Sequence, residues 1–428
     1  WREQEGDILA FLPGVREIER VKERLDARMP QTPILPLHGQ IDPAGQRAAI
    51  GLDRDGRRRI VLATSIAETS LTLDGVSIVV DSGLARMAEF DRAAGTTQLV
   101  TRRASQAAAA QRAGRAARQG PGVAYRLWEE AGHPGRPEFA APEIETADLS
   151  GLVLRLARWG TNDPASLAWL DAPPAASIAA ARDGLKAMGA LDAGGHITTM
   201  GEAIVDMPMA PHEAAALLYA ADGGCAEKVA GLVMLLQERG LGGRSEDLAQ
   251  RMDRWRGETS RRAQSARRIA QGWADRARKM GIALGARAQQ PAEALALARP
   301  DFVARRRDAS GENWISAGGR GFTLDPTSPL ARAEWLVIGE AQGSARSARI
   351  TSGLALHIDQ VERLFETELE SRSVIHWNTE KERVEARRER RLGAIKLSSA
   401  PDPDPDPQAV VDKLAQKALE RLGELLPP

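Results

Sequence analysis

The stretch Arg59–Thr72, which reads RIVLATSIAETSLT, joins a buried-strand pattern to a polar loop. Its first part, Arg59–Ala63, is an apolar run with the length and β-branched content of a strand that is covered on both faces. Hydroxyl groups and one carboxylate follow at once, from Thr64 onward. Because open parallel sheets bind ligands at the carboxyl ends of their strands, this order predicts an α/β fold with a ligand-contacting loop. The alternative is an ordinary Ser/Thr-rich helix cap.

Similar apolar runs alternate with helical stretches through residues 1–145, which is the rhythm of βαβ units. The other expected strands are Asp7–Leu12, Thr32–Leu37, Val76–Asp81 and Gly122–Leu127. Helical spacing of apolar residues predicts a helix over Val15–Arg28. Two extended segments between Arg86 and Arg103 predict a β-hairpin inserted into this unit.

The overall composition excludes several classes of protein. Lys plus Arg and Asp plus Glu both total 58 in 428 residues, so any nucleic-acid signal must be local. The single cysteine, Cys225, excludes an internal disulfide framework and a Cys-based zinc site, and it favours a reducing cytoplasm. No apolar run has the length of a membrane span, and the N-terminus shows no signal-peptide pattern.

The segment Gln111–Arg118, QRAGRAAR, is the most informative for chemistry. If it is helical, Arg115 and Arg118 share one face and could clamp the oxygens of a transferring phosphoryl group. A solvated basic helix is the alternative for the isolated octamer.

Several segments occur together in the order and spacing of a known family. Phe11–Gly14, Leu37–Gly39, Thr64–Thr72 and Gln111–Arg118 resemble motifs IV, IVa, V and VI of DEAH-box superfamily 2 helicases. The stretches that resemble the winged-helix signature of that family are Pro142–Ser150, Leu170–Pro174 and Met188–Leu191. The whole chain is most similar to the bacterial HrpB-type ATP-dependent helicases.

The resemblance implies an α/β fold in which a RecA-like parallel-sheet domain with an inserted β-hairpin precedes winged-helix, helical-bundle and β-rich C-terminal domains. The expected boundaries are 1–145 for the second RecA-like domain, 146–205 for the winged helix, 206–297 for the helical, ratchet-like domain, 298–399 for the β-rich HrpB-type domain, and 400–428 for a Pro/Asp linker with a terminal helix. The hairpin resembles the family's strand-separating wedge.

Transferred position by position, the resemblance makes Arg115 and Arg118 the arginine fingers. Gln111 would contact the γ-phosphate or its attacking water, and Asp74 would sense the bound nucleotide. The residues expected to contact the nucleic-acid backbone are Pro13, Gly14, Val15, Thr64, Ser65 and Thr69.

The chain departs from the family pattern at two of these positions. Ser65 stands where the family has Asn, so a hydroxyl replaces a longer amide. Ala117 replaces the last glycine of motif VI, which is harmless where the backbone is helical and costly where φ is positive. We expect a helical backbone there.

The resemblance implies ATP and Mg²⁺ as cofactors, but the sequence contains neither a Gly-Lys nor an Asp-Glu dipeptide. A Walker A loop and the acidic Mg²⁺-binding motif are therefore expected on a first RecA-like domain that precedes Trp1. This chain alone is expected not to hydrolyse ATP. The expected partners are that domain and single-stranded or duplex RNA, with DNA left open, in a bacterial cytoplasm. The alternative function is a non-catalytic nucleic-acid-binding or regulatory protein.

Two basic stretches lie outside these motifs. Residues 251–280 hold ten basic and three acidic side chains with Trp255 and Trp273 among them, a pattern that could pair phosphates and stack bases. A solvated helix with both tryptophans in the core is the alternative. The run Arg383–Arg391 contains Glu385 and Glu389 and is expected to be laced by surface ion pairs.

Overall fold

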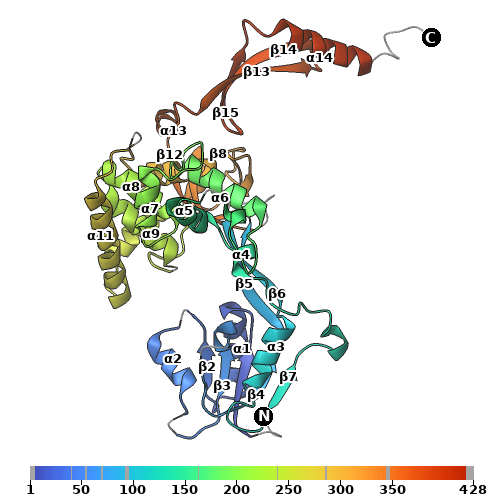
Figure 1. Cartoon of the computed structure of the whole chain (residues 1–428), viewed down its shortest axis with the longest axis vertical. Helices are drawn as coiled ribbons and strands as arrows, with labels where there is room; N and C mark the ends of the chain where they lie inside the picture. The colour runs from blue at the N-terminus through green and yellow to red at the C-terminus, as the bar shows by residue number, and fades with distance from the viewer. Residues whose placement is uncertain are drawn as a thin grey trace, which may run out of the picture. The chain divides into compact units, whose positions relative to one another are not determined.

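The computed structural model describes residues 5–39, 41–53, 55–68, 71–91, 96–161, 163–238, 240–284, 287–343 and 348–420. The chain divides into two compact units. The first comprises Trp1–Phe90 and Thr97–Ala147, and the second comprises Asp91–Thr96 and Asp148–Pro428. Each unit has its own set of helices and strands (Figure 1).

The first unit is built on a five-stranded parallel sheet with the strand order β2-β3-β1-β4-β7. Its strands are β1 (Asp7–Phe11), β2 (Ile34–Leu37), β3 (Ile60–Ala63), β4 (Val76–Asp81) and β7 (Val123–Arg126). Each lies within one or two residues of the range that the sequence predicts. The helices are α1 (Val15–Arg28), α2 (Pro43–Ile50), α3 (Gln106–Gly114) and α4 (Glu143–Thr146). The mixed α/β fold with a parallel sheet is therefore confirmed.

Alternate residues of the central strands supply two apolar clusters, one on each face of this sheet. Leu9 and Val61 belong to the cluster that includes Ala49 of α2. Ile60 and Leu62 belong to the cluster that includes Ile18 of α1. With both faces covered, the loops at the strand ends are what remains for binding. The strands β5 (Leu84–Asp91) and β6 (Thr96–Arg103) form the predicted hairpin as a separate two-stranded sheet.

The helix that carries motif VI ends earlier than expected. α3 stops at Gly114, and the amides of Arg115 and Ala116 bond to carbonyls three residues back, as in a 3₁₀ turn. The expectation of a helical backbone at Ala117 is wrong, because that residue lies in the following turn. Its φ is not positive, however, since Glu382 is the one non-glycine residue with positive φ in the described part of the chain. The alanine is therefore tolerated for a different reason.

The second unit begins with helices. They are α5 (Ser150–Trp159), α6 (Ala175–Ala187), α7 (Thr199–Val205), α8 (Pro211–Asp222), α9 (Ala226–Gln237), α10 (Leu248–Gly257), α11 (Arg261–Met280) and α12 (Pro291–Ala298). Between α6 and α7, Leu191 and Ile197 form an isolated antiparallel bridge. The winged-helix assignment of residues 146–205 stays a prediction.

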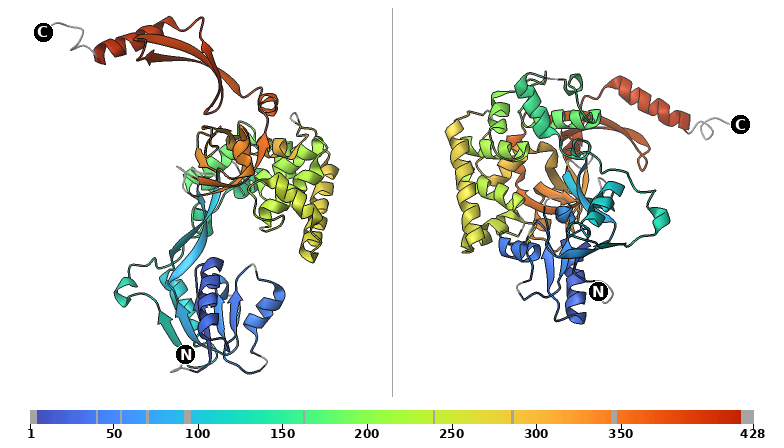
Figure 2. Two further views of the ribbon diagram at one scale, coloured as in Figure 1. Left: turned by 180° about the vertical axis from the view of Figure 1, so that it is seen from behind. Right: turned by 60° about the horizontal axis from the view of Figure 1, so that its bottom comes forward.

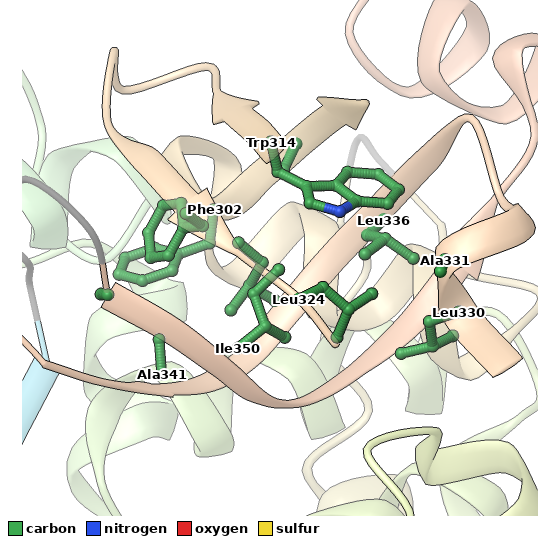
Figure 3. Close-up of a cluster of buried hydrophobic side chains, with 12 residues drawn as sticks. Phe302, Trp314, Leu324, Leu330, Ala331, Leu336, Ala341 and Ile350 are labelled. Atoms are coloured by element: carbon green, nitrogen blue, oxygen red, sulfur yellow. The ribbon is translucent and has the colours of Figure 1, made fainter. Parts of the chain in front are cut away.

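A closed five-stranded barrel with the order β10-β12-β11-β8-β9 follows α12. Its strands are β8 (Val303–Arg306), β9 (Asn313–Ser316), β10 (Gly321–Thr323), β11 (Trp335–Gln342) and β12 (Ala348–Leu356). Trp314, Leu336 and Ile350 are fully buried in its interior (Figure 3). Closure leaves no free sheet edge in this barrel.

The predicted β-rich region contains a second, separate sheet. Helix α13 (Ile358–Leu364) leads into β13 (Leu369–Asn378), β14 (Arg383–Leu392) and β15 (Ile395–Pro401), which form an antiparallel sheet that α14 (Pro407–Glu420) packs against. The Pro/Asp segment was expected to be a linker from residue 400 onward. Its first two residues, 400 and 401, instead belong to edge strand β15. Pro401 is compatible with a strand there because an edge strand need not donate every amide.

The ion pairs expected along Arg383–Arg391 are confirmed. Arg383 pairs with Glu385, and Arg391 pairs with Glu389 at 2.7 Å. No helix of the described residues combines the length and the apolar character that a membrane span requires.

Candidate nucleotide and nucleic-acid site

The carboxyl ends of β1, β3 and β4 meet at one edge of the parallel sheet, and each leads into a segment that the sequence singled out. Thr64 follows β3 and caps a short 3₁₀ helix, Ser65–Ala67. Its amide donates to the Leu37 carbonyl at 3.2 Å, so its position is set by the neighbouring strand β2. Thr64 is half-buried and Ser65 is exposed. Thr69, the third predicted contact of this loop, lies outside the described residues.

The Arg112 side chain contacts residues at or just after the ends of β1, β3 and β4. It is 1% exposed, and it pairs with Glu68 at 2.6 Å and with Asp81, at the end of β4, at 2.7 Å. Its guanidinium also lies 5.1 Å from the centre of the Phe11 ring at the end of β1. The motif pattern assigned no role to Arg112. The available signal was its position three residues after Ala109, which places both on the buried face of α3.

Arg115 is also buried, at 6% exposure, and it fixes the loop that follows β3. Its Nε donates to the Glu68 carbonyl at 2.8 Å and its Nη1 donates to the Leu71 carbonyl at 2.7 Å. Burial lowers the pKa of Arg115, and the positive charge of Arg118 lowers it further. Two guanidiniums therefore lie close enough to repel each other.

Arg118 and Gln111 are exposed and make no hydrogen bond or ion pair within the described residues. The structure thus separates the two predicted arginine fingers. The Arg115 guanidinium is engaged by carbonyl oxygens, whereas the Arg118 guanidinium is open to solvent. An anion that approached Arg118 would also relieve the repulsion between Arg118 and Arg115.

Asp74 is held beside motif VI by two contacts that were not foreseen. Its carboxylate accepts from the Gln119 amide at 2.9 Å, and the same side chain of Gln119 accepts from the Gly75 amide at 3.0 Å. The Asp74 carbonyl accepts from Arg59 at 2.7 Å. Arg59 is fully buried and pairs with Asp7 at 2.6 Å. The Asp74 turn is therefore fixed from two sides.

The turn at Pro13, Gly14 and Val15 opens helix α1. Pro13 and Gly14 are buried, and the first helical hydrogen bond runs from the Ile18 amide to the Gly14 carbonyl, which leaves the preceding amides unpaired within the helix. A Cβ at Gly14 would lie 2.5 Å from Nη1 of Arg86. The Arg86 side chain therefore passes over the turn, and its flexible end would have to move to admit a larger residue at position 14.

A triphosphate and Mg²⁺ differ in how they suit these residues. Exposed Arg118 and Gln111 present donors of the kind that phosphate oxygens accept. No three potential ligands from His, Cys, Asp and Glu converge anywhere in the described part of the chain. The residues at this edge of the sheet therefore present donors that suit phosphate oxygens.

The basic stretch 251–280 contains both buried and exposed side chains. Trp255 is 4% exposed and packs in the core, as the second alternative expects, whereas Trp273 is half-buried. Arg251 and Arg267 donate to backbone carbonyls. A signal for this burial was present, because Leu248, Met252 and Trp255 share one face of α10 at spacings of four and three.

Comparison with known proteins places the chain in a class. The family described as "Helicase conserved C-terminal domain" matches residues 1–120, the parallel-sheet unit that carries the motifs. The family described as "ATP-dependent RNA helicase HrpB, connector region" matches residues 368–402, which form the sheet β13–β15. The class defined by this fold and these loops is thus the C-terminal part of a helicase.

The relatives narrow this class. The chain is 35% identical over 434 residues to ATP-dependent RNA helicase HrpB of Escherichia coli, with 99% of this chain and 52% of that protein covered. It is 37% identical over 261 residues to the pre-mRNA-splicing factor ATP-dependent RNA helicase prp22 of Schizosaccharomyces pombe, with 59% and 22% covered. The crystal structure of the E. coli DExH-box NTPase HrpB superposes with a TM-score of 0.82 at 34% identity, with 98% and 51% covered.

The chain corresponds to the C-terminal region of HrpB-type DEAH-box RNA helicases. It spans about half the length of the E. coli protein.

Proposed function

We propose that this chain supplies the arginine-finger side of the ATP site, and part of the RNA-contacting surface, of an ATP-dependent RNA helicase. The observation that carries the proposal is the pair of neighbouring arginines in motif VI. Arg118 is open to solvent, while Arg115 is hydrogen-bonded to the motif V loop. One short segment therefore touches both the predicted phosphate side and the predicted nucleic-acid side.

ATP bound against this edge would present its γ-phosphoryl group for transfer to water. Phosphoryl transfer depends on positioning and electrostatic stabilisation more than on covalent chemistry by the protein. The Arg118 guanidinium would neutralise charge that develops on the phosphoryl oxygens, and the Gln111 amide would orient the phosphate or the attacking water. The Walker A loop and the metal-binding carboxylates would come from a separate P-loop domain.

Arg115 gives a route by which the nucleotide could move the RNA-contacting loop. To act as a second finger, Arg115 would have to exchange the carbonyls of Glu68 and Leu71 for phosphate oxygens. That exchange would release the loop that carries the predicted RNA contacts, Thr64 and Thr69. The hairpin β5–β6 would then serve as the wedge against which the strand is pulled.

The rival is a cytoplasmic nucleic-acid-binding or regulatory protein that performs no catalysis. Exposed Arg118 beside Arg115 suits the phosphates of a nucleotide and those of an RNA backbone alike, so these two arginines do not separate the functions. The relatives named as ATP-dependent RNA helicases support the helicase.

Single-stranded RNA binding separates the two functions. Affinity is measured by fluorescence anisotropy with the chain alone, and again with an isolated P-loop domain and a non-hydrolysable ATP analogue. The helicase function predicts a nucleotide-dependent change in affinity that Arg118→Ala removes and that Arg24→Ala, on the exposed face of α1, retains. An affinity indifferent to nucleotide would favour the rival.

A further inference from the structure

Helix α11 has two chemically different faces. Five alanines at spacings of three and four form the buried face, which packs against α8 and α9; they are Ala263, Ala266, Ala270, Ala274 and Ala277. The helix lies at the margin of the helical group in both figures (Figures 1 and 2). Its opposite face is exposed along the full 20 residues.

Four basic side chains lie on the exposed face: Arg261, Arg268, Arg276 and Lys279. At 3.6 residues per turn they fall within a sector of about 80° and extend over about 27 Å. We call these four residues the α11 basic face. Gly272 lies in the same sector, and a Cβ there would meet no atom within 4 Å, so the face is open along its middle.

The other basic residues of 251–280 are already engaged, with the exception of Arg254. Arg251 and Arg267 bond to backbone carbonyls, and the rest pair with carboxylates. Those pairs are Arg256 with Asp253, Arg262 with Glu238, and Arg278 with Glu227 and Asp275. The third acid of the block, Glu258, accepts from the Gly242 amide.

The α11 basic face therefore carries unbalanced charge. Its four side chains have no hydrogen-bond or ion-pair partner among the residues that the structure describes. Like charges on one helix face destabilise it, unless an anion balances them. Apart from Arg254, the unpartnered basic side chains of residues 251–280 thus form one linear patch of defined geometry.

We infer that the α11 basic face binds the sugar–phosphate backbone of RNA. A linear row of guanidinium and ammonium groups complements a linear row of phosphates. Trp255 is buried, and Trp273 is half-buried and lies about 60° outside the sector of these four residues, so the contact is electrostatic and independent of base sequence. The choice of RNA as the polyanion rests on the proposed function, and the site itself is separate from the loops of the parallel sheet.

The test compares two double variants of the same helix that remove the same charge. Arg268→Gln with Arg276→Gln alters the α11 basic face, whereas Arg262→Gln with Arg278→Gln removes arginines that are paired with carboxylates. Gln preserves helix propensity in both. Binding of the whole chain to a 20-nucleotide polyuridine RNA is measured by fluorescence anisotropy across a salt series.

We expect the face variant to bind roughly tenfold more weakly at low salt and the paired variant to change less than twofold. The slope of log affinity against log salt should fall by about 1.4 in the face variant, since each phosphate contact to a single strand contributes about 0.7. Polyadenosine should give the same losses. Arg261→Gln with Lys279→Gln should repeat the effect from the two ends of the face.

Equal losses in both double variants would show a general charge effect and overturn the inference. Unchanged binding by the face variant, or no RNA binding by the unaltered chain, would also overturn it. Failure of the proposed function can be distinguished from failure of this inference. In that case RNA affinity would not change with nucleotide or with Arg118→Ala, but it would still depend on the α11 basic face.

Discussion

The guanidinium of Arg115 donates to the backbone carbonyl of Glu68, 47 residues earlier in the chain, at 2.8 Å. This bond and the one to Leu71 tie motif VI to the loop that follows β3. A residue expected to meet phosphate is thus, in this conformation, part of the packing of its own unit. The neighbouring Arg118 keeps its guanidinium free for a ligand.

The two arginines should therefore differ when each is replaced. Arg115→Ala should destabilise the first unit by about 2 kcal/mol, because two carbonyls lose a charged donor. It should also speed hydrogen exchange of the amides around residues 66–72. Arg118→Ala should change neither quantity, since its side chain is exposed. Indistinguishable exchange in the two variants would contradict the anchoring role of Arg115.

Arg59 should matter to stability more than any exposed arginine. Arg59→Met leaves the carboxylate of Asp7 buried without its partner, which costs about 3–5 kcal/mol. The loss should appear as faster hydrogen exchange of β1 and β4, and adding Asp7→Asn should restore part of it. Arg24→Ala is the exposed control. An unchanged exchange pattern in Arg59→Met would show that the Arg59–Asp7 pair does not stabilise β1 and β4.

Gly122 should not tolerate a side chain. A Cβ there would lie 2.0 Å from the Ala116 carbonyl oxygen, in the turn between α3 and Arg118, and 2.7 Å from that of Ser77. Gly122→Ala should therefore lower the melting temperature of the first unit, with a cost of about 1–3 kcal/mol. Gly120→Ala, where a Cβ meets no atom within 4 Å, is the matched control and should melt like the unaltered chain.

His212 should make the second unit sensitive to acid. Burial, reinforced by the charge of Arg299, lowers the pKa of His212 from 6.5 to about 3. The folded state therefore holds it neutral, so its contribution to stability is complete above pH 6.5 and is lost as the pH falls towards 3. Between pH 7 and 5 the loss is at most about 2 kcal/mol, because protonation of the unfolded state costs about 1.4 kcal/mol for each pH unit below 6.5; the partial exposure of the side chain makes the loss smaller.

Melting temperatures at pH 7 and pH 5 check this expectation. His212→Gln should reduce the drop seen in the unaltered chain. The neighbouring carboxyl of Glu213, whose pKa is raised by burial, acts in the opposite direction in both proteins and so cancels in the comparison. His196→Gln, at a side chain that is 70% exposed, should keep the full drop. An identical drop in His212→Gln would remove His212 as the cause.

Local sequence patterns were sufficient to predict the strands and the first helix of the parallel-sheet unit. The helix Val15–Arg28 and the strand Val76–Asp81 coincide with their predicted bounds, because each has an apolar pattern with a clear beginning and end. The end of α3 was missed because the alanine-rich sequence continues unchanged past Gly114. At the end of the helix the Arg115 side chain bonds to the distant carbonyls of Glu68 and Leu71.

The main limit on prediction from the sequence was that many contacts join residues far apart in the chain. The burial of Arg59 and Arg112 depends on Asp7 and Asp81, which are 52 and 31 residues away. Basic residues look alike in a sequence whether they face solvent or close a buried ion pair. The split of the β-rich region into a barrel and a separate sheet likewise depends on distant pairings, such as that of Phe322 in β10 with Ala348 in β12.

The most direct test of the proposed function is ATP hydrolysis by the chain combined with a separate P-loop domain, with and without Arg118→Ala. An arginine finger contributes about 10³–10⁵ in rate. The account predicts a loss of that order for Arg118→Ala, with little change for Arg24→Ala. Hydrolysis that continues undiminished after Arg118→Ala would contradict the assignment of this chain to the arginine-finger side of the ATP site.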